Sequence, residues 1–254
     1  MKNSAIKKSG ALLFVLLTAF SVWATSYQER DDINRSFSLP ARARVDVSGF
    51  SGSVDVQAVD GDVAMVQIEQ SARNRAELDC MKLVLEQAAG NLTIQSKNMG
   101  GHGCNNIQVR SRVLLSLPRH VDLSIHGVSG PINVGEIHGA LRISGNSGHI
   151  NIAQSGRGSR ITGNSGRTNI KLGKLDARGL EVSGNSGEIK LYVDEESNFD
   201  VRVSGHSGSA SSELPNVKFI KTGNADYYAR IGSGGPTVIV SGNSGGVLVT
   251  RSPE

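Results

Sequence analysis

A five-residue phrase, Ser-Gly-x-Ser-Gly or a near copy, recurs through most of this 254-residue chain. From Gly127 onward the first glycines of successive phrases are 18, 18, 21, 21, 18 and 19 residues apart, if a degenerate copy at 222–224 is included. Self-similarity at such a period is typical of solenoids, whose units bury their apolar faces against one another. The full copies cover residues 48–52, 126–130, 144–148, 162–166, 183–187, 204–208 and 241–245.

Apolar residues flank each phrase at fixed offsets. Around Gly145, Leu141 and Ile143 stand four and two positions before the glycine, and Ile150 and Ile152 stand five and seven positions after it. Alternation with a period of two indicates strands with one buried face. Because the two pairs differ in parity, a straight strand would turn one of them outward. We therefore predict two short strands per unit, with a corner at the phrase.

Asparagine occupies the centre of the corner in five copies. It is one of the few residues besides glycine that tolerate the left-handed backbone region. In stacked units these amides would lie about 4.8 Å apart, where each can hydrogen-bond to the next. The predicted structural corner ladder consists of Asn146, Asn164, Asn185, Asn224 and Asn243.

The predicted fold is all-β, a parallel β-solenoid (β-helix-like) of 18–21-residue coils with a β-rich N-terminal capping section. The alternative is that each phrase closes an antiparallel hairpin of a meander or barrel. Tight hairpins favour Asn-Gly at the turn, whereas serine intervenes here. The units around Gly205 and Gly223 are expected to pack least tightly. The second strand of the first unit reads Ser-Ala-Ser-Ser at 209–212, and the other unit has Lys221 where an aliphatic residue is expected.

The N-terminus predicts export. Within residues 1–24 three lysines precede the apolar run 11–20, and Val-Trp-Ala at 22–24 suits a signal peptidase, so the mature chain would begin near Thr25. The alternative is an uncleaved anchor. No later segment approaches the ~20 apolar residues of a spanning helix, so no stable membrane insertion is expected after cleavage. We expect a periplasmic protein, with the cell surface or the medium as alternatives.

The mature chain is nearly neutral. Without the three lysines of the leader, 24 basic residues face 23 acidic ones. This balance gives no electrostatic footprint for nucleic acid, and we expect no such partner. Four Phe and four Tyr remain, which weighs against stacking platforms for glycans or single strands.

Residues 25–120 are expected to form a β-rich section that caps the repeats of 121–250, with a short tail at 251–254. Strands are predicted over 63–68, 81–85, 92–94 and 107–117, with a hairpin turn at 88–91 and a helical signal only near 76–80. Cys80 and Cys104 are expected to form a disulfide, which would stabilise the fold by roughly 3 to 4 kcal/mol. A metal site at His102 would need more ligands than these cysteines supply.

A search for catalytic chemistry finds none, and no cofactor is expected. Polysaccharide lyases and hydrolases need carboxylates clustered on adjacent coils, and the position after each phrase is instead mixed. The serines lack a Gly-x-Ser-x-Gly elbow. The histidines at 126, 149 and 206 stand at different offsets from the glycine.

A polar strip along one sheet face is the most promising place for a partner. Six positions after the first glycine come Asn133, Asn151, Asn169 and then Lys190. Such strips are usually solvated surface. Our hypothesis is that a protein or glycan lies along this one. Its outward neighbours are His149, Arg167 and Glu188.

Residues 35–250 resemble the bacterial putative-adhesin family of exported β-solenoid proteins, related to the head GIN domain. The resemblance depends on Phe-Ser-Leu-Pro at 37–40, the first copy Val-Ser-Gly-Phe-Ser-Gly-Ser-Val-Asp-Val at 47–56, Leu-Pro at 117–118 and the later Ser-Gly-Asn-Ser-Gly units. It implies adhesion and supplies no catalytic residues. The chain shows no cell-wall sorting signal or C-terminal translocating barrel.

The sequence thus predicts an exported, non-enzymatic binding or scaffolding protein whose partner is an unknown envelope protein or glycan. Two alternatives stay open. One is a carbohydrate-active β-helix enzyme, and the other is a structural component of the envelope that self-associates.

Overall fold

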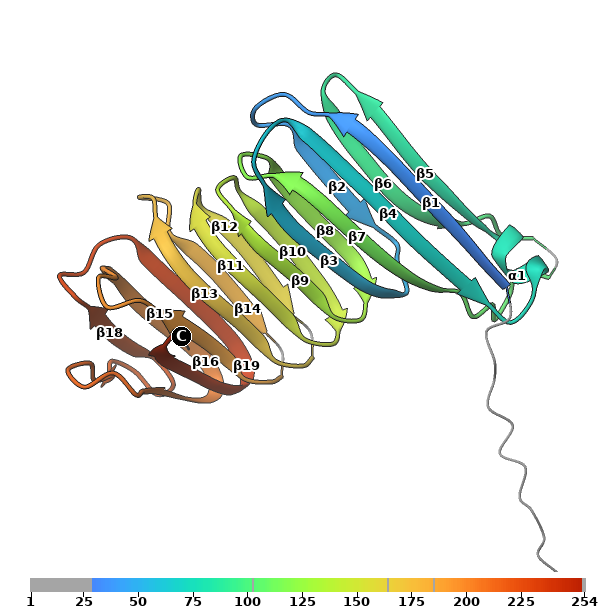
Figure 1. The fold of residues 1–254 in the computed structure, drawn as a ribbon. Helices are drawn as coiled ribbons and strands as arrows, with labels where there is room; N and C mark the ends of the chain where they lie inside the picture. Colours follow the sequence, from blue (N-terminus) through green and yellow to red (C-terminus); the bar gives the residue numbers. More distant parts are fainter. Residues whose placement is uncertain (1–28, 102, 164, 185, 253–254) are drawn as a thin grey trace, which may run out of the picture.

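The computed structural model of the chain describes residues 29–101, 103–163, 165–184 and 186–252. The predicted signal segment 1–24 and His102 lie outside them. Within them the chain forms strands and one five-residue helix, so the predicted all-β class is confirmed (Figure 1). None of the described helical structure is long and apolar enough to cross a membrane.

The strands have the following bounds: β1 (Glu29–Ser38), β2 (Arg44–Ser48), β3 (Gly52–Val59), β4 (Val63–Ala72), β5 (Met81–Ala88), β6 (Asn91–Asn98), β7 (Arg110–Pro118), β8 (Asp122–Ser129), β9 (Ile132–Ile137), β10 (Leu141–Ser147), β11 (Ile150–Gly156), β12 (Ser159–Gly163), β13 (Thr168–Leu175), β14 (Leu180–Gly184), β15 (Ile189–Val193), β16 (Phe199–Ser212), β17 (Ile220–Lys221), β18 (Tyr227–Ile231) and β19 (Thr237–Arg251).

Each repeat unit contributes one strand to each of two sheets. The strand before the corner joins the first sheet, which contains β2, β8, β10, β12 and β14. The strand after the corner joins the second sheet, which contains β3, β9, β11, β13 and β15. β16 and β19 run through the corner and belong to both sheets.

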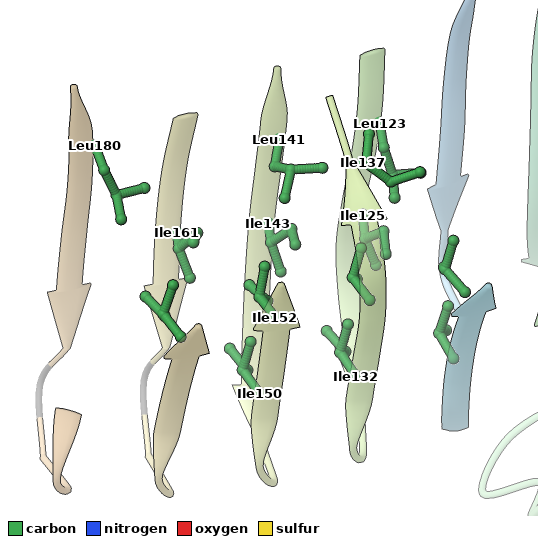
Figure 2. Close-up of a cluster of buried hydrophobic side chains, with 14 of the residues drawn as sticks. Leu123, Ile125, Ile132, Ile137, Leu141, Ile143, Ile150, Ile152, Ile161 and Leu180 are labelled. Atoms are coloured by element: carbon green, nitrogen blue, oxygen red, sulfur yellow. The ribbon is translucent and has the colours of Figure 1, made fainter. Parts of the chain in front are cut away.

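Successive units pair in parallel, and equivalent residues are register partners. Ile143 lies opposite Ile125, and Ile150 lies opposite Ile132, one repeat away in each case. The alternating apolar residues therefore meet between the sheets and form one continuous core (Figure 2). Burial of such a side chain contributes about 1.5 to 3 kcal/mol, so the repeats are held together by the residues that the alternation identifies.

Both ends of the stack are antiparallel, so the sheets are mixed. At the N-terminal end β4 pairs with β1 and β7, and β5 pairs with β6. At the C-terminal end β18 pairs with β16 and β17. β5 and β6 meet at the predicted turn, where Ala88 faces Asn91.

The order of the last units in space differs from their order in the sequence. β19 pairs with β14 and β15 on one side and with β16 on the other, so it lies inside the stack. The units at this end are therefore not stacked in the order of the sequence. Val247 and Val249 of β19 are buried, whereas their register partners in β16, Ala210 and Ser212, are only half-buried. The apolar strand thus occupies the inner position, and the serine-rich strand lies outside it.

The corners differ from the prediction in one respect. In the copies with a central asparagine, the second glycine adopts positive φ, as in Gly148 (φ 107°) and Gly187 (φ 120°), and Asn146 does not. In the first two copies the first glycine also has positive φ, at Gly49 (φ 76°) and Gly127 (φ 64°). A Cβ on Gly187 would lie 1.9 Å from the carbonyl oxygen of Gly166. Glycine is therefore required both for the backbone angle and for the close approach of neighbouring units.

The predicted corner ladder is only partly described. Asn146 is exposed at its corner. Asn224 is not at a corner between parallel units, because its loop joins the antiparallel strands β17 and β18. Asn164, Asn185 and the side chain of Asn243 lie outside the described part, so hydrogen bonds between corner amides stay a prediction.

The N-terminal section contains the predicted disulfide and helix. Helix α1 (Arg75–Asp79) begins after Asn74, whose side chain accepts a hydrogen bond from the Glu77 amide at 3.0 Å. This is an ordinary N-cap. Cys80 follows the helix and is bonded to Cys104, with the two Cα atoms 5.5 Å apart.

Candidate binding surface

The outer face of the second sheet holds the seven residues of the predicted polar strip. In the parallel register Asn151 lies between Asn133 and Asn169, and Asn169 lies opposite Lys190. All four are half-buried. The residues six positions after the first glycine of four successive units thus form one column across β9, β11, β13 and β15.

The three asparagines form a hydrogen-bonded ladder, which we call the amide ladder. Asn151 Nδ2 donates to Asn133 Oδ1 at 2.7 Å, and Asn169 Nδ2 donates to Asn151 Oδ1 at 2.8 Å. The ladder begins at β3, where Asn133 Nδ2 donates to the carboxylate of Asp55 at 2.6 Å. Amide stacking of the kind predicted for the corner therefore occurs along this column of the strands.

The ladder has a direction. An ionised carboxylate only accepts hydrogen bonds, so Asp55 fixes the orientation of Asn133 and, through it, of each later amide. The chain of bonds ends at Asn169 Oδ1, which is buried and without a hydrogen-bond partner. Such a group costs free energy when it is left unpaired. Its register neighbour Lys190 instead places its ammonium 3.5 Å from Glu188.

A second column of the strip consists of His149, Arg167 and Glu188, directly before β11, β13 and β15. Arg167 Nε lies 3.2 Å from Glu188 Oε2, and the Arg167 amide donates to His149 Nδ1 at 3.4 Å. Glu188 therefore faces both Arg167 and Lys190. The charges of the strip largely compensate one another, so it presents hydrogen-bonding groups more than net charge.

A hollow of about 470 Å³ adjoins the amide ladder. Its floor includes the small residues Gly135 and Ala153, and the larger side chains of Lys171 and Tyr192 also line it. Sequence reasoning missed these four residues, although each stands eight positions after the first glycine of its unit. It also missed Asp55, which stands six positions after the first glycine of the first copy. The same alignment could have found all of them.

The groups that this surface presents are hydrogen-bonding groups. Amide groups, one tyrosine hydroxyl and one exposed lysine can bind hydroxyl or carboxylate groups of a ligand. Across the described residues, no group of three or more His, Cys, Asp or Glu side chains could hold a metal ion. The two carboxylates of the surface, Asp55 and Glu188, bond to neighbouring side chains.

Strand pairs stacked by one repeat, with a hydrogen-bonded strip outside and an aliphatic core inside, define a repetitive all-β protein. The Toastrack DUF4097 family model matches residues 37–250, and the chain belongs to this family. The resemblance to the bacterial putative-adhesin proteins is thereby confirmed. No curated protein matches the sequence.

Three solved structures are similar to the chain. A putative cell adhesion protein from Clostridium sporogenes has 11% sequence identity and a TM-score of 0.47, over 88% of this chain and 100% of the other. A putative adhesin from Bacteroides fragilis has 12% identity and a TM-score of 0.42, over 87% and 97%. A putative lipid binding protein from Parabacteroides distasonis has 15% identity and a TM-score of 0.29, over 87% and 97%.

Proposed function

We propose that this protein is an exported, non-enzymatic β-solenoid that binds or scaffolds a partner in the bacterial cell envelope. The polar strip and the hollow beside it form the binding surface. The ligand is an envelope protein or a glycan, bound along the direction in which the units stack.

The solenoid part of the proposal is supported by the register of the repeats. β8, β10, β12 and β14 pair in parallel at offsets of 18 and 21 residues, as coils of one winding would. The antiparallel ends fit capping elements, because an open parallel edge would pair with other chains. Export is supported by the leader-like composition of residues 1–24.

The single observation that carries the binding proposal is the amide ladder. Four polar groups at one strand spacing, each fixed by its neighbour, present a rigid row of hydrogen-bonding groups next to a hollow. A surface that is ordered before binding loses little entropy when a ligand arrives. Extended concave or flat surfaces of this kind are what repeat proteins use for binding.

The test is capture of partners from envelope extracts together with a glycan-binding screen. We expect Lys171→Ala to weaken the interaction, because Lys171 is exposed at the hollow. Lys82→Ala is the matched control, because Lys82 is also exposed but lies on β5 at the N-terminal end. If both variants retain a captured partner equally well, the hollow is not the binding surface.

A further inference from the structure

The outer face of the first sheet has a hollow of its own, of about 550 Å³. It lies over β8, β10, β12 and β14. Its lining combines small residues, among them Ser124, Ala140 and Gly158, with the arginines Arg142 and Arg160. The small side chains leave space above the sheet, and the long arginine side chains surround this space.

Two arginines in this hollow are direct cross-strand neighbours. Arg142 lies opposite Arg160 in the parallel pair of β10 and β12, and both are exposed. Like charges placed directly opposite one another destabilise a sheet. Arg160 is neutralised from its other side by Glu181, with Nη2 to Oε2 at 2.6 Å and Nε to Oε2 at 2.8 Å.

Arg142 has no such compensation. Its other register neighbour is Ser124, and no carboxylate of the described residues forms an ion pair with it. The other charges around the hollow are paired: Arg178 with Asp176, and Arg157 with Asp122 at 3.8 Å. The hollow therefore holds one uncompensated guanidinium.

Hydroxyl groups accompany this charge. Ser144 and Thr162 line the hollow two residues after the two arginines, and Thr162 Oγ1 lies 3.0 Å from Ser183 Oγ. Ser124 lies beside Arg142 on the adjacent strand. A cation with several hydroxyls around it matches a ligand that carries both an anionic group and hydroxyl groups.

We propose that this hollow binds an acidic saccharide whose carboxylate pairs with Arg142. The planar guanidinium presents two parallel N–H donors to a carboxylate, which gives both strength and orientation. The hydroxyls of Ser124, Ser144 and Thr162 hydrogen-bond to the sugar. No Phe, Tyr or Trp side chain is among the residues that line the hollow, so charge takes the place of stacking on such rings in recognition.

A membrane surface fits the hollow less well than a saccharide. Attraction to anionic lipids requires a cluster of several Lys or Arg, and only one uncompensated cation is present here. The hollow also lies on the sheet opposite to the polar strip, so this proposal does not depend on the function proposed for the strip.

The experiment is calorimetric titration of the full chain with oligogalacturonate, and with a neutral galactose oligosaccharide for comparison. We expect oligogalacturonate to bind and the neutral oligosaccharide not to bind. The affinity for oligogalacturonate should fall as salt is added. Arg142→Gln should weaken binding about tenfold or more, the usual effect of removing one charged hydrogen-bond partner. Glu181→Gln should strengthen it, because it releases the guanidinium of Arg160.

Arg112→Gln is the matched control. It removes the same charge from an exposed position on β7, in the second sheet, and should leave affinity unchanged. Urea unfolding of the Arg142 variant verifies that it is folded. The proposal is overturned if oligogalacturonate does not bind, or if Arg142→Gln and Arg112→Gln behave alike. It is also overturned if vesicles of phosphatidylglycerol bind and oligogalacturonate does not.

Discussion

The amide ladder predicts that the position of an asparagine within it determines its contribution to stability. Asn151, in the middle, makes two ladder hydrogen bonds, one to Asn133 and one from Asn169. Asn169, at the end, makes one, because its Oδ1 has no partner. A typical hydrogen bond contributes about 1 kcal/mol net to stability. Asn151→Ala should therefore cost about 2 kcal/mol, and Asn169→Ala about 1 kcal/mol.

Urea unfolding followed by circular dichroism measures the difference. The midpoint should fall roughly twice as far for Asn151→Ala as for Asn169→Ala, at an unchanged slope. Asn34→Ala is the matched control, since Asn34 is exposed on the edge strand β1 and its side chain has no hydrogen-bond partner in the described structure. It should shift the midpoint little.

A result in which Asn169→Ala costs as much as Asn151→Ala would refute this reasoning. It would mean that packing against the side chains around the hollow, and not the number of ladder hydrogen bonds, determines how much these residues contribute to the free energy of unfolding. A double substitution of Asn133 and Asn151 gives an independent measure. If the two are bonded as described, the double variant loses less than the sum of the single variants by about 1 kcal/mol.

Three further predictions concern the scaffold. Ile143→Ala, at a site 2% exposed, should lower the free energy of unfolding by about 2 to 5 kcal/mol in the same assay. Gly187→Ala should lower the thermal midpoint much more than Gly61→Ala, because both have positive φ but only a Cβ at 187 would meet a neighbouring backbone. The pKa of Asp200 is lowered by the Tyr228 hydroxyl, and then by an arginine nearby, so the stability that this carboxylate adds is present above the ordinary carboxyl pKa of about 4 and lost as pH falls below it. Tyr228→Phe should weaken this loss of stability in acid, and unchanged acid titration of the variant would contradict the assignment.

Much of the scaffold could be predicted because the pattern that determines it lies within a few residues of each phrase. The alternation around each phrase identifies Leu141 and Ile143 as buried, and equal spacing makes their register partners the same residues of the next unit. Strand β1 was not predicted, and the reason again lies in its local sequence. Half of its ten residues are charged, and its two apolar residues, Ile33 and Phe37, are only half-buried, because it is an edge strand with little core to cover.

The order of the last units could not be predicted from local patterns. β14 could pair equally well in register with β16 or β19, since both present valines at the same offsets. The choice depends on the second half of each strand, where Val247 and Val249 fill the core and the smaller Ala210 and Ser212 at the equivalent positions are only half-buried. Which strand pairs with β14 therefore depends on how well two segments far apart in the sequence, β16 and β19, fill the same position in the core.

The strip was predictable as a column but not as a ladder. The offset from the glycine places Asn133, Asn151 and Asn169 together. Which amide group faces which neighbour depends on Asp55, 78 residues before Asn133 in the chain. The hollow depends on the small size of Gly135 and Ala153 next to that column, which matters only once the strands are side by side.

The inner position of β19 has a consequence for how the molecule is made. A ribosome delivers the chain from its N-terminus, so β16 is complete before any of β19 exists. Until residue 237 has emerged, β16 has no parallel partner of its own, and the edge of β14 lies open to it. Val201 and Val203 have the same spacing as Val238 and Val240, so β16 can compete for that edge until β19 is available. The stack therefore cannot be completed in the order of synthesis, and its last two positions form only when the chain is nearly whole.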